Sequence, residues 1–507
     1  MKHRIEKIKE YLQRPIHIQN FIETEKCIES IEQDIKNARL NVADTEKALV
    51  RILQETQMYD LCFLYLTTAL IGLTHKTQYL SLLLQGVLCC ECLTVQNLEF
   101  IYKQVSAIVF RHPDIVNDEV TELMNQLYHC IYQALKSGIR IPPKRQQCHK
   151  ERVVVMTANF LGERHAPTHS TLERSFILQR NAKKQVMIVS TSEGASVAGR
   201  IPFFHACISN RINQYDALEH YSWQGESFGF YQAGENINTT EELQCIVDTV
   251  ANYNPYYVMY VGGRSYVADL INEFCPVVTV STVFSTIPKG NTAFAMIGRK
   301  ITEEEQSKSR SELIEVPFSF ELTEKKRAYS REELGISEDV FVLAVVGNRL
   351  DSDVSDLFLK YMEQTTNCLL LFIGKFDAYP YRVISHPWLR GHSVALGQIS
   401  DVMGVLECAD LYVNPIRLGG GFSVIEGFHA GIPAVSCRYG DVSVAAGEDF
   451  CVDSYEEMLS VIQKYQIDKE FYQSQLQRAK AREKEITDGS AGLLKGLQQM
   501  EQSSRFW

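Results

Sequence analysis

The feature that most constrains the fold is a series of short aliphatic runs, three to seven residues long, in the last two thirds of the chain. Runs with few polar residues are typical of parallel strands buried on both faces, and the segments between them are long enough for crossover helices. The pattern predicts an α/β fold with two Rossmann-like domains in tandem. The runs are Val153–Met156, Val186–Val189, Tyr257–Val261 and Val277–Val280, then Val340–Val346, Leu369–Ile373, Leu411–Val413 and Ala434–Ser436.

The first part of the chain lacks such runs and is predicted to be helical. Residues 1–140 contain only three of the 29 glycines and two of the 14 prolines, so few residues there interrupt a helix. The apolar stretch Leu61–Leu73 falls short of the roughly 20 residues that cross a bilayer, and we expect a buried core helix. The charged amino terminus does not resemble a secretory signal.

Domain boundaries follow from helix stops and polar stretches. A glycine and a proline pair between Ser137 and His149 favour an extended linker. We predict an all-α domain over residues 1–145, a first Rossmann-like (acceptor) domain over 150–325, a second (donor) domain over 326–480, and a C-terminal helix or tail over 481–507. Because open parallel sheets bind ligands beyond the carboxyl ends of their strands, two facing sheets would hold both ligands in a cleft.

The composition excludes several classes of protein. The 507 residues are 45% hydrophobic and 22% charged, which is typical of globular domains. The formal net charge of −11 argues against nucleic acid as a partner. Cys89, Cys90 and Cys92 form the only cluster among 14 cysteines, with no second pair at zinc-site spacing, so we expect reduced thiols in a cytoplasmic protein.

The strongest local signal is the segment from Asn414 to Ser436, which reads as strand, glycine loop, helix and proline-led strand. Glycines 419–421 allow close approach of the backbone to a ligand, and amides at a helix amino terminus suit a diphosphate. Ser423 is expected to cap the helix or bind a phosphate oxygen. Glu426, one turn inside the helix, is placed to accept hydrogen bonds from two ribose hydroxyls, or merely to favour the positive end of the helix dipole.

The segment Gly419–Val435 resembles the donor-site signature of GT-B glycosyltransferases, especially the retaining enzymes of family four. The resemblance implies a nucleoside diphosphate sugar, a UDP-sugar in our prediction, on the second domain, with Glu426 at the ribose. The family usually has a second glutamate eight positions earlier, where this chain has Leu418. The family's lysine a few residues after the first-strand turn also has no clear equivalent.

Other positions follow from the same resemblance. Val346–Leu350 is similar to the family's glycine-arginine turn, so Arg349 is expected to neutralise the diphosphate as it leaves. Arg417 is a second candidate cation, and Leu396–Ser400 is where the base would bind. The predicted donor-binding residues are Gly347, Asn348, Arg349, Gly397, Gln398, Ile399, Arg417, Gly419, Gly420, Gly421, Phe422, Ser423 and Glu426.

In the first Rossmann-like domain, polar residues follow the strand at Val153–Met156. Ser170 and Glu173 have the spacing of a capping box, which predicts a helix starting near Thr171. The loop before it would direct His165, Thr168 and His169 at the acceptor or the sugar, with His169 as the catalytic candidate that assists acceptor deprotonation. Gly263 lies in a further glycine turn after a strand, and we expect this turn to contact the acceptor or the sugar, or else simply to reverse the chain.

The helical first domain followed by residues 168–171 also resembles bacterial cytoplasmic transferases that glycosylate adhesins, which are inverting. The sequence thus predicts a hexosyltransferase-type glycosyltransferase that acts with retention on a glycan or protein hydroxyl. The alternatives are a non-catalytic GT-B subunit of a transferase complex and a nucleotide-sugar epimerase. We expect no cofactor beyond the nucleotide sugar, no metal and no transmembrane segment. The helical domain is expected to bind a bulky acceptor or to form homo- or hetero-oligomers.

Overall fold

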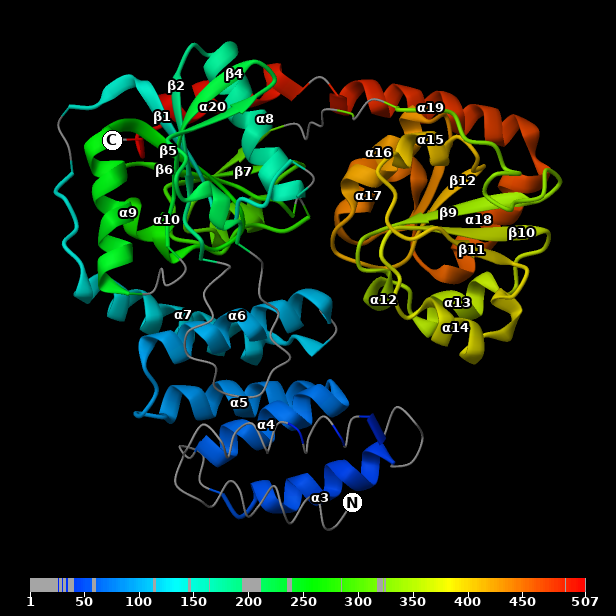
Figure 1. Cartoon of the computed structure of the whole chain (residues 1–507), viewed down its shortest axis with the longest axis horizontal. Coiled ribbons are helices and arrows are strands. Elements are labelled where there is room, and N and C mark those ends of the chain that lie inside the picture. Colours follow the sequence, from blue (N-terminus) through cyan, green and yellow to red (C-terminus); the bar gives the residue numbers. More distant parts are fainter. Residues whose placement is uncertain are drawn as a thin grey trace. The chain divides into compact units, whose positions relative to one another are not determined.

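The computed structural model describes residues 41–56, 61–112, 115–144, 147–163, 165–193, 211–234, 239–283, 285–316, 322, 325–487 and 489–506, together with Lys26, Ser30, Gln33 and Asp34. It contains a helical region, an eight-stranded sheet and a six-stranded sheet (Figure 1). Two compact units divide the chain: Met1–His169, Met187–Pro255 and Ser265–Cys275 form one, and Ser170–Val186, Tyr256–Arg264 and Pro276–Trp507 form the other.

In the helical region, three helices have a side-chain cap at their amino terminus. Asn41, Thr94 and Asn117 accept hydrogen bonds from amides of the first turns. The predicted core helix is confirmed, because α4 is buried along most of its length. The helices are α3 (Val42–Leu53), α4 (Leu61–Thr74), α5 (Thr77–Cys89), α6 (Val95–Arg111) and α7 (Asp118–Gly138).

The eight-stranded sheet has the strand order β3-β4-β2-β1-β5-β6-β7-β8. Its strands are β1 (His149–Thr157), β2 (Gln185–Ser190), β3 (His220–Trp223), β4 (Glu226–Gln232), β5 (Pro255–Val261), β6 (Val277–Val280), β7 (Phe294–Ile297) and β8 (Glu312–Glu315). Its helices are α8 (Ala166–Arg180), α9 (Thr240–Tyr253), α10 (Tyr266–Ile271) and α11 (Glu303–Lys308). All four aliphatic runs predicted for this domain are strands of the sheet.

Four strands of this sheet, β3, β4, β7 and β8, were not predicted. β3 and β4 form an antiparallel hairpin, and β4 pairs in parallel with β2. Gln224 and Gly225 lie between them with φ of 49° and 79°, the left-handed conformation that a two-residue hairpin turn needs. The sheet is therefore mixed at this edge. A glycine in the second turn position was the available sequence signal.

The six-stranded sheet has the order β11-β10-β9-β12-β13-β14, and every pair in it is parallel. Its strands are β9 (Phe341–Val346), β10 (Cys368–Ile373), β11 (Ser393–Ala395), β12 (Leu411–Asn414), β13 (Ala434–Cys437) and β14 (Cys451–Val452). The associated helices are α12 (Leu350–Asp353), α13 (Asp356–Met362), α14 (Tyr379–Ser385), α15 (Val402–Leu406), α16 (Gly421–His429), α17 (Gly440–Ala446), α18 (Tyr455–Ile467) and α19 (Lys469–Thr487). The last helix, α20 (Gly489–Gln502), packs instead against β8 of the eight-stranded sheet (Figure 1).

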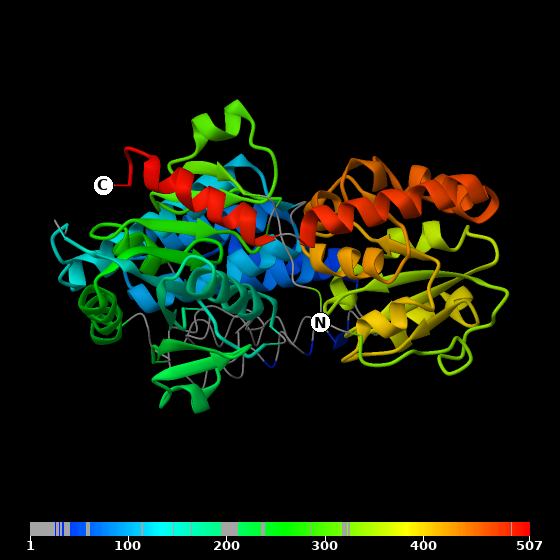
Figure 2. The same cartoon turned by 90° about the horizontal axis from the view of Figure 1, so that it is seen from above.

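Both faces of this sheet are buried, as the runs predicted. Successive residues of β9 alternate between two hydrophobic cores: Val342 and Ala344 pack with α15, α16, α17 and α19, and Leu343 and Val345 pack with α13 and α18. Figure 2 shows α19, in orange to red, lying along the first of these layers, where Arg482 donates to backbone carbonyls of α17.

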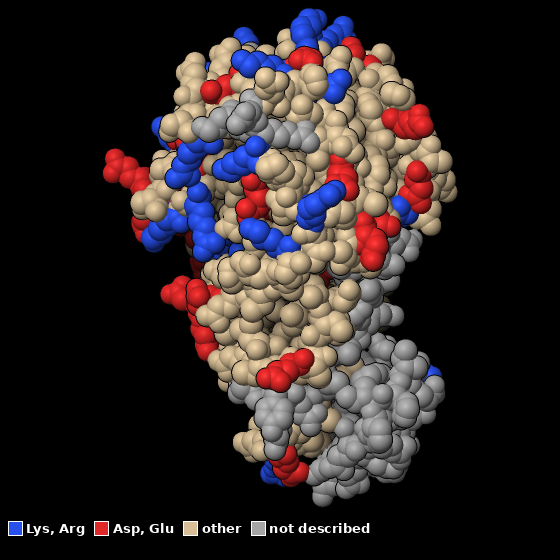
Figure 3. Space-filling model, turned by 90° about the vertical axis from the view of Figure 1, so that its left-hand side faces the viewer, with Lys and Arg blue, Asp and Glu red and all other residues tan. Residues whose placement is uncertain are grey.

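The surface carries both signs of charge. In Figure 3, Lys and Arg side chains gather in one area of the face shown, and Asp and Glu side chains lie around it. Among the described helices, none combines the length and the apolar character that spanning a bilayer requires. In the cysteine cluster, the sulfur atoms of Cys90 and Cys92 lie 3.2 Å apart, whereas Cys89 is exposed.

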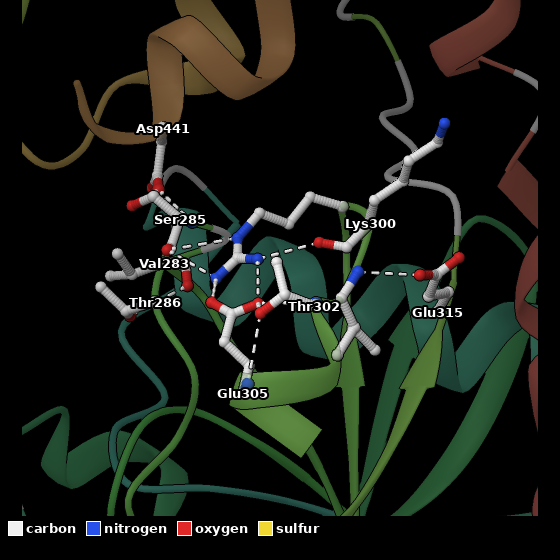
Figure 4. A network of polar contacts seen from close by, with 10 residues as sticks. Val283, Ser285, Thr286, Lys300, Thr302, Glu305, Glu315 and Asp441 are labelled. Atoms are coloured by element: carbon white, nitrogen blue, oxygen red, sulfur yellow. Dashed lines mark hydrogen bonds and ion pairs between the residues drawn. The ribbon is translucent and has the colours of Figure 1, made fainter. Parts of the chain in front are cut away.

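Arg299, after β7, organises a polar network around the first turn of α11. Figure 4 shows its partners Ser285, Lys300 and Glu305. Its guanidinium pairs with Glu305 at 2.6 Å and donates to the carbonyl of Ser285. Glu305 also accepts from Thr302, in a capping box. The Arg299 hydrogen bond, followed by that of the Thr302 amide, lowers the pKa of Glu305 from 4.5 to about 2.

This pairing predicts a stability loss in acid. Because the folded pKa of Glu305 is below its unfolded value, its contribution is complete above pH 4.5 and is lost as pH falls toward 2. We expect Glu305→Gln to lower stability at pH 7 by about 1–2 kcal/mol, since the pair is partly exposed, and to weaken the acid dependence. Thermal unfolding between pH 7 and pH 2.5 measures this. An equal effect of Glu304→Gln, a more exposed carboxylate on α11, would contradict it.

Candidate functional site

The carboxyl ends of five parallel strands meet at one edge of the six-stranded sheet. The loops that leave this edge carry most of the predicted donor-site residues. They are Gly347–Arg349 after β9, Gly374–Phe376 after β10, Gly397–Ile399 after β11, Arg417–Gly420 after β12 and Arg438–Tyr439 after β13. Ligands of open parallel sheets bind at such an edge.

The glycine loop has the predicted relation to a helix. Gly420 has a φ of +105° and is the residue before α16, which no side chain caps. Gly420 is exposed, Gly419 is half-buried and Gly421 is buried as the first residue of the helix. Because an uncapped helix amino terminus carries partial positive charge, this loop is suited to a phosphate group.

Arg349 lies beside the glycine loop, although the two are separated by about 70 residues in sequence. A Cβ atom on Gly419 would lie 3.1 Å from Nη2 of Arg349. Arg349 is exposed and immediately precedes α12, and its neighbour Asn348 is exposed as well. The structure thus brings together the two motifs that the resemblance implied for the diphosphate.

Arg417 has a different position from the one predicted, because its side chain points into the protein. The residue is 6% exposed, and its nitrogens bond to Asn414 Oδ1 at 2.7 Å and Tyr412 Oη at 3.0 Å, and pair with Asp353 at 3.3 Å. These contacts use Nε and both terminal nitrogens. Arg417 therefore stabilises the loop through buried contacts on its protein side. We do not propose it as a ligand of the donor.

Two polar residues of α16 are buried. The Ser423 hydroxyl donates to the carbonyl of Gly420 at 2.8 Å and contacts Tyr412 Oη at 2.7 Å, so it closes the loop and makes no side-chain cap of the helix amides. Glu426 is 6% exposed and lies in the second turn. Phe422, between them and the loop, is half-buried.

Two glycines that the sequence analysis missed pack the loops together. At Gly374, with a φ of +123°, a Cβ would lie 2.0 Å from the carbonyl oxygen of Gly347, and its amide donates to the carbonyl of Gly397. At Gly440, with a φ of +71°, a Cβ would lie 2.1 Å from the carbonyl oxygen of Arg417. Their positions directly after β10 and within the turn after β13 were the available signals.

A cation was also missed. Lys375 follows β10 at the same edge, and its carbonyl accepts from the amide of Leu350 at 3.2 Å. Its side chain is 55% exposed and pairs with Asp377 at 3.1 Å. The sequence just after Arg349 contains no equivalent of the family's lysine. Lys375, which follows the adjacent strand β10, lies close to that part of the chain in space.

In the eight-stranded part, the prediction that a helix starts near Thr171 is wrong. α8 begins at Ala166, so Ser170 and Glu173 lie inside it. Pro167 suits the first helical turn, because the N–H groups of that turn have no acceptor within the helix and proline has none to satisfy. His169 is consequently in the helix, edge-on to Trp223 with ring centroids 5.8 Å apart.

His165 and Thr168 contact each other. His165 Nδ1 lies 3.0 Å from the hydroxyl of Thr168, which is buried and accepts from the amide of Leu161 at 2.9 Å. Burial lowers the pKa of His165, which favours a neutral ring at pH 7. Thr168 thus orders the turn before α8.

Gly263, in the turn after β5, is exposed, and nothing lies within 4 Å of the position of a Cβ. In the part of the chain that the structure describes, no three His, Cys, Asp or Glu side chains are grouped so that they could hold a metal ion. The metal requirement itself stays a prediction.

Comparisons with known proteins place this fold among glycosyltransferases. No family model and no curated protein matches the sequence. An O-GlcNAc transferase mutant from Thermobaculum terrenum is similar in structure, with a TM-score of 0.55 and 11% identity over 99% of this chain and 97% of that one. A glycosyltransferase from Rickettsia africae has a TM-score of 0.51 and 12% identity over 70% of this chain and 100% of that one. At these identities the likeness shows the fold, and the predicted GT-B fold is confirmed.

Proposed function

We propose that the chain is a hexosyltransferase-type glycosyltransferase that moves a sugar from a UDP-sugar to a hydroxyl of a glycan or protein. The observation that carries the proposal is the position of Arg349 beside Gly419 at the uncapped amino terminus of α16. A guanidinium and a set of amides at one point suit a diphosphate. The GT-B fold is consistent with this use of the site.

In the proposed reaction, the bond between the sugar and the diphosphate breaks, and negative charge develops on the leaving UDP. Arg349 and the amides at the start of α16 stabilise that charge, as donors fixed before the reaction. Gly397–Ile399 contacts the base, and Glu426 accepts from the ribose. His169 or His165 takes the proton of the acceptor hydroxyl. Retention of configuration is proposed from the likeness of the glycine loop to family four.

A second candidate function is a binding subunit without turnover. The observation that favours it is Leu418, which stands where the family has a glutamate. Both candidates bind the donor, and only the enzyme releases UDP from it.

A panel of UDP-sugars distinguishes the two candidates. The protein is first tested for a rise in unfolding temperature with each sugar nucleotide, because a ligand that binds only the folded state stabilises it. UDP release is then measured with and without a serine-containing peptide or an oligosaccharide. The enzyme is expected to bind and turn over at least one donor. Binding without turnover favours the subunit, and an absence of binding to any nucleotide sugar contradicts both.

Glu426 provides a sharper test of the donor site. We expect Glu426→Ala to weaken UDP affinity about 10- to 100-fold, since it removes hydrogen bonds from a charged acceptor. Glu426→Gln retains one acceptor oxygen, and its UDP affinity is expected to lie between those of the wild type and Glu426→Ala. Titration calorimetry with UDP measures both. Glu485→Gln, on α19 with a side chain 68% exposed, is the control. Unchanged UDP affinity in a folded Glu426→Ala protein would refute the ribose assignment.

A further inference from the structure

A buried carboxylate lies where the helical region meets the first turn of α10. Glu193, after β2, is 6% exposed. It accepts from the hydroxyl of Ser265 at 2.5 Å and from the amides of Tyr266 and Val267 at 3.0 and 3.3 Å. Thr191 donates to it as well, at 3.0 Å. Four donors thus hold one side chain against the start of α10.

The same helix is held by the helical region. Tyr128 of α7 stacks on Tyr266 with ring centroids 4.4 Å apart, and its hydroxyl donates to Asp269 at 2.7 Å. Tyr132 and Lys136, also on α7, bond to Glu273 just after α10, at 2.6 and 2.7 Å. Every residue of α10 is buried.

Burial of Glu193 is compensated by the donors around it. Burial raises the pKa of Glu193, the Ser265 hydrogen bond and the charge of Lys103, on α6, lower it, and Glu99 raises it. A buried carboxylate is stable only when charges or donors compensate for its lost hydration, and the hydrogen bonds from Thr191, Ser265, Tyr266 and Val267 supply that compensation.

We propose that Glu193 is a positioning residue that fixes the turn Gly262–Arg264 by holding Ser265 and the first amides of α10. The turn is continuous with Ser265, whose hydroxyl is bonded to Glu193 and also accepts from the amide of Ala268 at 3.0 Å. Releasing Glu193 removes the fixed point at which the turn joins α10. The use of this turn by an acceptor rests on the proposed function, whereas its fixation does not.

Hydrogen exchange in the full chain tests this proposal. In Glu193→Ala we expect amide exchange of the peptide spanning residues 262–268 to accelerate at least about tenfold, because two amides and a hydroxyl lose their acceptor. Glu193→Gln retains an acceptor oxygen and is expected to restore part of the protection. Glu304→Gln, on exposed α11, is the matched control and is expected to match the wild type.

The outcomes separate a local from a general effect. Acceleration confined to residues 262–268, with peptides of β9 unchanged, supports the positioning role. Unchanged exchange in Glu193→Ala overturns it, as does equal acceleration in all peptides. Should Glu193→Ala fail to fold, Glu193→Gln replaces it, because its amide oxygen can still accept from part of the donors while the second acceptor oxygen is lost.

UDP titration in the same variants keeps this proposal distinct from the proposed function. The donor site lies on the six-stranded sheet, so Glu193→Ala is expected to bind UDP within twofold of the wild type, and a larger loss overturns the local role. A wild-type protein that binds no nucleotide sugar would refute the proposed function and leave the exchange result standing.

Discussion

Replacing Arg349 with alanine is expected to lower the rate of sugar transfer about 100- to 1000-fold, the range for losing one donor that stabilises charge in the transition state. The guanidinium lies next to Gly419, where the glycine loop meets α16. Charge that develops on the leaving diphosphate would therefore lose its cation, while the fold keeps its core because Arg349 is exposed. Single-turnover UDP release at saturating donor measures the effect.

The control variants for Arg349 address charge and fold. Arg349→Lys keeps the charge without the planar fork and is expected to recover part of the rate. Arg478→Ala removes an arginine of α19 whose side chain is 49% exposed, and it is expected to be as active as the wild type. A rate within threefold of the wild type in Arg349→Ala, with normal unfolding temperature, would show that the diphosphate is bound elsewhere.

Replacing Arg417 with methionine is expected to destabilise the protein by about 3–5 kcal/mol, because it leaves partners of a buried charge without compensation. The side chain of Arg417 is 4% exposed and that of Asp353 is 11% exposed. Asn414 and Tyr412 lose donors as well. Since Tyr412 also contacts Ser423, which closes the glycine loop, we expect weaker UDP binding in the same variant.

The unfolding midpoint of Arg417→Met is expected to fall by roughly 6–20 °C, at about 2–4 °C per kcal/mol for a domain of this size. Calorimetry measures the midpoint. Adding Asp353→Asn is expected to recover part of the loss, because it removes the unpaired carboxylate. Arg478→Met is the exposed control. A midpoint equal to that of the control would mean that the buried contacts of Arg417 contribute little.

Local sequence was sufficient for eight of the fourteen described strands and for the glycine loop. Strands buried on both faces leave uninterrupted aliphatic runs, and all eight predicted runs are strands. The turn that precedes α16 needs a residue at φ of +105°, which glycine adopts without strain, so Gly420 was visible along the chain. The sequence signal for the hairpin of β3 and β4 was weaker, because an antiparallel edge strand need not be apolar throughout.

The direction of individual side chains was decided by tertiary structure. Arg349 and Arg417 both lie next to glycine turns in sequence, yet one is exposed beside Gly419 and the other is buried over Asp353. Their exposure differs because β9, β12 and the loops after them bring different partners from distant segments to each arginine. Lys375 joins the same edge for that reason. The order of residues along the chain indicates secondary-structure propensity and burial. Which side chains pair across about 60 residues depends on how the strands are ordered in the sheet.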